Sequence, residues 1–204
     1  MLARYGYLNP LKTVLLVCDM QSKNREAVDH FTQVAQNVRK LMDSVRLLGV
    51  KIIATEHQSD SANAHSAEEL NLYERDVPII EKTKFTMFVP EVQKAVGNEI
   101  KTIVLCGIES HVCVYQTAVD FLTNGYNVHV VVDASSSRSL TDRTYAYKQL
   151  ASYGANLTTA ECIIYALMRD SNHPKFEDVK QIFLEDPPDT GLVSRSKCSE
   201  QTDH

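Results

Sequence analysis

The segment of the chain most suited to chemistry is Lys101-Thr-Ile-Val-Leu-Cys106-Gly-Ile-Glu-Ser-His-Val-Cys113, an apolar run followed by a turn and a cysteine. The pattern predicts a strand, a turn and a helix that begins near His111. The sulfur of Cys113 would then lie at a helix N-terminus, where free N–H groups and the helix dipole stabilise a thiolate. The same N–H groups could hold a tetrahedral oxyanion. Cys113 is therefore a candidate nucleophile, although a cysteine among valines is more often a packing residue.

Two further ionisable residues follow short apolar runs. Asp19 comes directly after Val14-Leu-Leu-Val-Cys18, and Lys82 follows Pro78-Ile-Ile-Glu. Taken alone, each has an ordinary interpretation, because Asp is a preferred helix N-cap and Lys is usually exposed. Together with Cys113 they form a coherent set. Asp19 would accept the thiol proton and pass it to a leaving amine, while Lys82 would orient Asp19 and stabilise negative charge.

The rest of the chain predicts the elements that must position these side chains. Apolar runs alternate with amphipathic segments of about 10 to 20 residues, which is typical of a doubly wound, mostly parallel α/β sheet with helices on both faces. In such sheets functional groups gather at the carboxyl ends of the strands. We expect strands at 13–18, 50–54, 101–106, 127–132 and 156–159, and helices at 26–48, 112–122, 141–152, 163–168 and 176–183.

Length and composition indicate the number of domains, the kinds of partner and the location of the protein. The chain has 204 residues, of which 44% are hydrophobic, and this favours a single domain over 1–186. We expect the polar segment 187–204 to be a disordered tail. The net charge is −5. Without a basic excess, we expect no nucleic-acid partner. No apolar stretch approaches the roughly 18 to 20 residues that span a bilayer, and the first residues lack a signal-peptide core. Five cysteines without C-x-x-C spacing favour a reducing, cytoplasmic location. The candidate site leads us to expect a small-molecule substrate.

Three separated motifs carry a resemblance to a known family. They are Leu16-Val-Cys-Asp19-Met-Gln21, Glu81-Lys82-Thr-Lys-Phe-Thr86-Met-Phe88 and Cys106-Gly-Ile-Glu-Ser-His-Val-Cys113-Val. Across residues 12–185 the sequence resembles the isochorismatase-like cysteine hydrolase superfamily, which includes nicotinamidases, N-carbamoylsarcosine amidases and isochorismatases. It looks most similar to the eukaryotic isochorismatase domain-containing proteins, through Val132-Asp-Ala-Ser-Ser-Ser-Arg-Ser and Pro187-Pro-Asp-Thr-Gly.

The resemblance implies roles for particular residues. Asp19, Lys82 and Cys113 would be catalytic, and the backbone amides of Glu109 and Cys113 would form an oxyanion hole. The family's cis peptide would correspond to the bond between Ile108 and Glu109. The resemblance also implies a homo-oligomer. Candidate residues of the substrate pocket are Gln21, Phe88 and His111.

A metal site is a weaker possibility. Nicotinamidases of this superfamily place an Asp and two His residues after the second strand to bind a metal, whereas the matching stretch here is Glu56-His57-Gln-Ser-Asp60-Ser-Ala-Asn-Ala-His65. Carboxylate and imidazole suit zinc or iron, which makes Glu56 and His57 weak candidates. Because the Asp-x-His arrangement is absent, we expect neither a metal nor another cofactor.

The sequence therefore favours a hydrolase that cleaves a small amide or a related substrate through a Cys113 thioester. Two alternatives remain open. One is isochorismatase-type hydrolysis of a vinyl ether, which does not require a thiol. The other is a binding or scaffold protein that retains the fold with vestigial activity, since fold and motif do not guarantee turnover.

Overall fold

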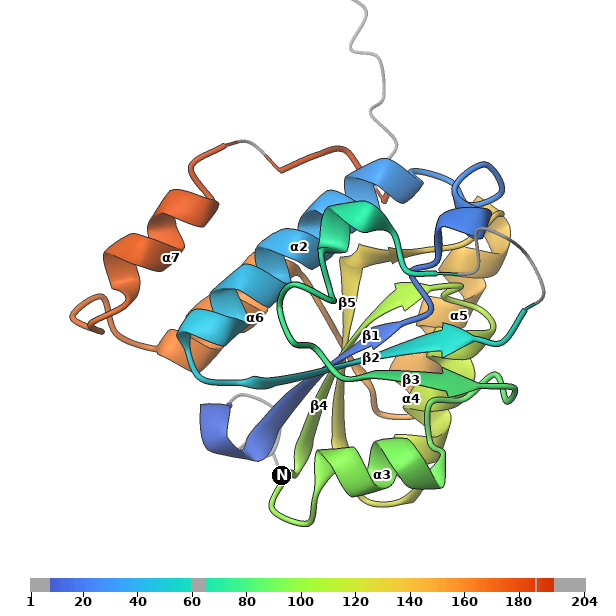
Figure 1. Ribbon diagram of the computed structural model, residues 1–204, viewed down its shortest axis with the longest axis horizontal. Helices are drawn as coiled ribbons and strands as arrows, with labels where there is room; N and C mark the ends of the chain where they lie inside the picture. Colours follow the sequence, from blue (N-terminus) through green and yellow to red (C-terminus); the bar gives the residue numbers. More distant parts are fainter. Residues whose placement is uncertain (1–7, 60–64, 186, 193–204) are drawn as a thin grey trace, which may run out of the picture.

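The computed structural model describes residues 8–59, 65–185 and 187–192, and it consists of a six-stranded sheet between two layers of helices (Figure 1). The strand order is β3-β2-β1-β4-β5-β6, and every neighbouring pair is parallel. The predicted fold class is thus confirmed. The strands are β1 (Thr13–Cys18), β2 (Lys51–His57), β3 (Ile79–Lys82), β4 (Thr102–Ile108), β5 (Asn127–Ser136) and β6 (Asn156–Thr158).

Helices cover both faces of the sheet. Helices α2, α6 and α7 lie on one side of it, and α3, α4 and α5 lie on the other (Figure 1). Every residue of β1 is buried, because β1 lies between β2 and β4 and is covered above and below. The helices are α2 (Phe31–Leu47), α3 (Pro90–Val96), α4 (Cys113–Thr123), α5 (Leu140–Ser152), α6 (Ala160–Met168) and α7 (Phe176–Ile182).

Helix α2 starts later than its apolar pattern predicts. Val34, Val38, Leu41 and Val45 recur at helical spacing and are buried against the sheet. The helix nevertheless begins at Phe31 and not near residue 26, because the backbone at His30 is left-handed, with φ of 57°. Before that point the chain turns through a short 3-10 helix, η2 (Ser22–Asn24).

Strand β3 and helix α3 were not predicted, and β5 is longer than expected. The edge strand β3 has only four residues, and α3 makes about two turns, so neither carries a long periodic pattern. Strand β5 continues beyond residue 132. The register between β4 and β5 shifts after Leu105, and this irregularity lets Gly107 and Ile108 pair with Ser135 and Ser136.

Part of the polar C-terminal tail has fixed contacts. The guanidinium of Arg143 is buried and donates hydrogen bonds to the carbonyl oxygens of Thr190, Val132 and Ser135, at 2.6, 2.9 and 2.6 Å. Thr190 is itself buried. The rest of the predicted disordered segment, 193–204, lies outside the described residues. Among the described residues no helix is long and apolar enough to cross a membrane.

Candidate active site

Asp19 lies directly beyond the carboxyl end of β1 and is 3% exposed. Its backbone is left-handed, with φ of 48°, and its amide donates to the carbonyl of Thr55 at 3.1 Å. The Thr55 hydroxyl donates to Asp19 Oδ1 at 2.7 Å. The carboxylate therefore does not cap a helix, as the ordinary interpretation of the sequence supposes. It is fixed between β1 and β2.

Lys82 is the last residue of β3, and its side chain is wholly buried. Its Nζ donates to Asp19 Oδ2 at 2.6 Å and to the carbonyls of Lys84 and Phe85 at 3.1 and 3.0 Å. These contacts use all three ammonium donors. Burial lowers the pKa of Lys82, but the charge of Asp19 and its hydrogen bond to Lys82 outweigh burial and raise the pKa overall. The ammonium is thus charged and fixed at the other oxygen of Asp19.

Cys113 is the first residue of α4, and it is 8% exposed. Its Sγ lies within 4.8 Å of both a carboxylate oxygen of Asp19 and the Sγ of Cys18. The structure therefore brings together the acid, the ammonium and the thiol that three distant segments of the sequence contribute. Asp19 is hydrogen-bonded to Lys82 at 2.6 Å and lies within 4.8 Å of the Cys113 sulfur.

Gly107 permits this close approach of β4 to β1. Its φ is 116°, and a Cβ at this position would lie 2.1 Å from the carbonyl oxygen of Cys18. A side chain here would displace either the end of β1 or the turn that leads to Cys113. The turn requires glycine both for its backbone conformation and for space.

The turn between β4 and α4 presents backbone amides near Cys113. The Ile108–Glu109 peptide bond is cis, and the amides of Ser110 and Val112 donate to the carbonyls of Ser136 and Glu109. As the first residue of α4, Cys113 has an N–H without an intrahelical acceptor. The amides of Glu109 and Cys113 are the two that the family resemblance implies for an oxyanion hole, which stays a prediction.

The side chain of Glu109 links this turn to Arg138. Its carboxylate accepts four hydrogen bonds from the backbone and guanidinium of Arg138, at 2.5 to 3.2 Å. Burial raises the pKa of Glu109, but the hydrogen bonds and charge of Arg138 outweigh it, and the pKa is lowered overall. The ion pair ties the turn to the end of β5.

The three candidate pocket residues have different surroundings. Gln21 is buried, and its side-chain amide donates to the His57 carbonyl and accepts from the His57 amide, both at 3.0 Å. It links the segment after β1 to the end of β2. The Phe88 ring packs edge-on against Phe121, with centroids 4.9 Å apart, within the core beneath α4. His111 lies on the turn and its Nδ1 is 3.0 Å from the Ser137 hydroxyl.

Of the two weak metal candidates, Glu56 has hydrogen-bond partners, whereas His57 Nδ1 is buried without one. Glu56 Oε1 accepts from the amide and hydroxyl of Ser66, at 2.6 and 2.7 Å. The His57 ring stacks on Phe85, and burial followed by the charge of Lys82 lowers its pKa, so the ring is neutral. Asp60 lies outside the described residues. Within the described ranges, the cluster of ligand-type side chains close enough to hold an ion is Cys18, Asp19 and Cys113.

Sequence reasoning missed two contributors to the site, Cys18 and Thr55. Both are apolar-strand residues that pair with each other across β1 and β2. Thr55 binds Asp19, and the Cys18 sulfur lies beside Cys113. The position of Cys18 next to Asp19 was the available signal.

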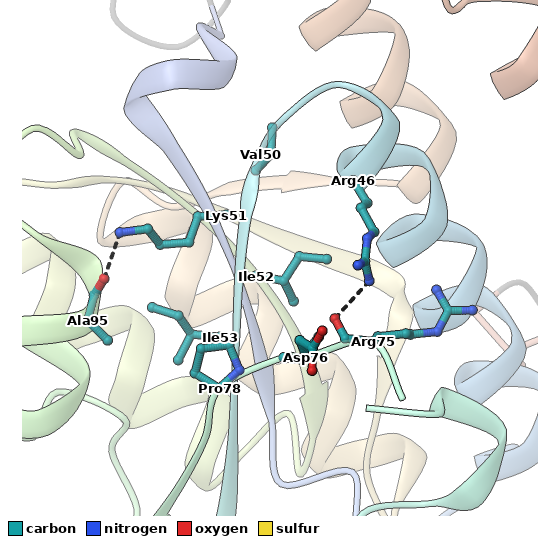
Figure 2. Close-up of a pocket in the computed structure, with 10 residues that line it drawn as sticks. Arg46, Val50, Lys51, Ile52, Ile53, Arg75, Asp76, Pro78 and Ala95 are labelled. Carbon is teal, nitrogen blue, oxygen red and sulfur yellow. Dashed lines mark hydrogen bonds between the residues drawn. The ribbon is translucent and has the colours of Figure 1, made fainter. Parts of the chain in front are cut away.

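A pocket of about 460 Å³ lies away from this site (Figure 2). It adjoins the amino-terminal end of β2, and its cationic side chains already have partners. Lys51 donates to the Ala95 carbonyl, and Arg46 donates to the Arg75 carbonyl, both at 2.8 Å (Figure 2). The catalytic-type cluster lies at the carboxyl ends of the strands, as is usual in parallel α/β sheets.

Comparison with known proteins agrees with the motifs. The family model described as the isochorismatase domain matches residues 13–162. The chain belongs to the isochorismatase family. Isochorismatase domain-containing protein 2 of Xenopus laevis is 38% identical over 195 residues, which cover 95% of this chain and 94% of that protein.

Solved structures of other proteins share the fold. A Caenorhabditis elegans structure called MAR1 ribonuclease has a TM-score of 0.87 and 42% identity, covering 94% of this chain and 99% of that one. The ycaC gene product of Escherichia coli, described as an octameric hydrolase of unknown specificity, has a TM-score of 0.74 and 25% identity, covering 87% and 96%. The resemblance to the isochorismatase-like hydrolase superfamily is thus confirmed.

Proposed function

We propose that this protein is a cysteine hydrolase that cleaves the C–N bond of a small, non-peptide amide. The observation that carries the proposal is the position of the Asp19 carboxylate. One oxygen is 2.6 Å from Lys82 Nζ, and the carboxylate lies within 4.8 Å of Cys113 Sγ. An acid held this way can exchange a proton with the thiol while its own orientation stays fixed.

The reaction proceeds in two stages. Asp19 accepts the proton of Cys113, the sulfur attacks the amide carbon, and the backbone amides of Glu109 and Cys113 hold the oxyanion. Asp19 then protonates the leaving ammonia or amine, which leaves a thioester on Cys113. A water molecule, with Asp19 as base, hydrolyses this thioester and restores the thiol. Lys82 stabilises the negative charge of the cluster throughout.

The exposure of the site supports a small substrate. Cys113 is 8% exposed, and the Lys82 side chain is fully buried, so an extended polymer chain has little surface to contact at the sulfur. The network at the site also uses backbone carbonyls and a threonine hydroxyl to hold the charged pair. Such preorganisation favours acyl transfer to a fixed nucleophile.

The proposal is tested with a panel of small primary amides and released ammonia as the readout. We expect turnover of at least one member, abolished in Cys113→Ala and reduced in Asp19→Asn by about two orders of magnitude or more, the range expected for a general acid–base residue. With a vinyl ether as substrate, by contrast, turnover should continue in Cys113→Ala, because that reaction does not require the thiol. Unchanged amide turnover in this variant contradicts the thioester mechanism.

The reactivity of the thiol gives a test that is independent of substrate. Iodoacetamide should label Cys113 faster than Cys18, Cys106, Cys162 and Cys198. Equal, slow labelling of all five favours a binding or scaffold protein with vestigial activity. The Asp19→Asn variant should lose the preference for Cys113 if the carboxylate accepts its proton.

A second candidate function is ribonuclease activity, because the C. elegans structure at 42% identity carries that name. The net charge of −5 gives little electrostatic support for binding a phosphate backbone. Cleavage of a labelled single-stranded RNA by this chain, lost in Asp19→Asn and Lys82→Met, would favour this second function over amide hydrolysis.

We also propose that the chain forms a homo-oligomer in the cytoplasm. The E. coli ycaC product is described as octameric, which supports the homo-oligomer, and the cysteines scattered without C-x-x-C spacing support a reducing compartment. Sedimentation at several protein concentrations tests the assembly. A mass equal to one chain of 22.9 kDa at every concentration contradicts it.

A further inference from the structure

The proposed hydrolysis makes no use of Cys18, a second thiol at the same site. Cys18 is the last residue of β1, and it is completely buried. Its Sγ lies within 4.8 Å of Cys113 Sγ and of the Asp19 carboxylate. Burial, the side chain of Cys113 and the charge of Asp19 together raise its pKa well above the usual value, so Cys18 is a neutral thiol.

The two sulfurs differ in solvent exposure, and this difference assigns them different chemical roles. Cys113 is 8% exposed, whereas Cys18 is completely buried. Both belong to the core cluster between the sheet and α4, so their side chains approach each other from β1 and from the first turn of α4. An oxidant that enters the site meets Cys113 first, and Cys18 is the thiol nearest to the product.

We propose that hydroperoxides convert Cys113 and Cys18 into a reversible intramolecular disulfide that blocks the active site. The proposal rests on the proposed function in one respect, namely that Cys113 is a reactive thiol. Cys18 then acts as the resolving thiol of the pair. In reducing compartments disulfides of this kind are transient and redox-sensing.

The reaction balances with one equivalent of hydroperoxide. The Cys113 thiolate attacks one peroxide oxygen, the O–O bond breaks, and the other oxygen leaves as water or an alcohol after protonation, which gives Cys113 sulfenic acid. The Asp19 carboxylate, within 4.8 Å of Cys18 Sγ, accepts the Cys18 proton as this sulfur attacks the sulfenic sulfur and the S–O bond breaks. Asp19 then passes the proton to the leaving hydroxide, which becomes water. The peroxide is reduced by two electrons, and the two thiols are oxidised.

Formation of the bond requires only a short movement. The sulfurs must approach from within 4.8 Å to about 2 Å, the length of a disulfide. Cys113 lies at the first residue of α4, where the terminal turn is held by fewer hydrogen bonds than the helix interior. Oxidation removes the nucleophile, and it also protects Cys113 from irreversible oxidation to sulfinic acid.

Cys106 offers a matched control thiol. It is completely buried, as Cys18 is, and burial raises its pKa. Its Sγ donates to the carbonyl of Leu16 at 3.7 Å and belongs to the core cluster on the opposite face of the sheet from Cys113. If a disulfide formed by chance on unfolding, Cys113 would pair with Cys106 as readily as with Cys18.

The experiment treats the folded, reduced protein with hydrogen peroxide in a Cys162→Ser, Cys198→Ser background, which removes the exposed and C-terminal thiols. We expect a mass loss of about 2 Da, reversed by dithiothreitol, whereas Cys18→Ser should instead gain about 16 or 32 Da. Cys106→Ser should behave like the background. Cleavage after Glu109 separates Cys106 from Cys113 and identifies the linked peptides without reduction.

Iodoacetamide labelling of Cys113 supplies a second readout. After peroxide it should slow by about tenfold or more and recover with dithiothreitol, whereas in Cys18→Ser the recovery should be incomplete. Rapid labelling of Cys113 before peroxide, combined with no Cys18–Cys113 peptide afterwards, overturns this inference and leaves the hydrolase proposal intact. Slow labelling before peroxide contradicts the hydrolase proposal itself.

Discussion

Lys82 and Asp19 form an ion pair in which a wholly buried ammonium lies 2.6 Å from a carboxylate that is itself 4% exposed. Both groups are thus largely removed from solvent. Removal of one member leaves the other as an unpaired buried charge, which is more costly than the loss of both.

The first prediction concerns this pair. Lys82→Met and Asp19→Asn should each lower the free energy of unfolding by about 3–5 kcal/mol, because each leaves a buried charge or an uncompensated donor. The double variant should be more stable than the sum of the single losses predicts. Urea unfolding of the four proteins in a double-mutant cycle measures the coupling. Strictly additive losses contradict the direct interaction.

The second prediction concerns Gly107. Gly107→Ala places a Cβ 2.1 Å from the Cys18 carbonyl oxygen, whereas Gly125→Ala, at φ of 83°, has no atom within 4 Å. The control variant should lose about 1–2 kcal/mol from its left-handed backbone alone. Gly107→Ala should lose more than this and should also lose Cys113 labelling. Equal stability of the two variants in thermal unfolding would argue against the close approach of β4 to β1.

The third prediction is a pH dependence of stability. His129 on β5 is buried, its Nε2 has no hydrogen-bond partner, and burial lowers its pKa to about 4. The unfolded chain binds a proton near pH 6.5 and the folded protein does not, so stability is full above pH 6.5 and falls as the pH drops towards 4.

His129→Leu isolates this contribution. The wild type should lose about 2–3 kcal/mol more than the variant between pH 7 and pH 4.5, since one pKa unit corresponds to about 1.4 kcal/mol. Urea unfolding of both proteins at each pH gives the difference. Parallel losses in the two proteins would assign the acid sensitivity to other groups.

The fourth prediction concerns Arg143. Arg143→Met removes three hydrogen bonds to buried carbonyl oxygens, including that of Thr190. It should lower the free energy of unfolding by about 3 kcal/mol or more, since each unpaired buried group costs about 1–3 kcal/mol. Arg39→Met is the control, because its ion pair with Asp43 spans 3.9 Å and the side chain is 53% exposed. That variant should change stability by less than about 1 kcal/mol.

The sequence predicted the meeting of Asp19, Lys82 and Cys113 because each follows an apolar run. In a parallel sheet such positions share one edge. The chemical roles of these residues stay predictions. Thr55 and Cys18 could not be assigned to the site in this way. Their contribution depends on the pairing of β1 with β2. It also depends on the left-handed backbone at Asp19, because this conformation ends the alternation of side chains along β1.

Secondary structure was predicted best where the apolar pattern is long or uniform. Strand β1 has the predicted bounds, whereas β3 is too short to carry a pattern and the extension of β5 depends on a register shift against β4. The start of α2 is set by the backbone of His30 and not by hydropathy. These features arise from pairing and local backbone geometry, which no single segment encodes.

The position of β3 at the outer margin of the sheet has a consequence for inactivation. Lys82 comes from the four-residue edge strand, whereas Asp19 follows the central strand β1. Marginal strands fray before the interior of a sheet opens. Under mild denaturant, activity should therefore disappear while the bulk of the protein is still folded, and amide exchange in β3 should precede exchange in β1.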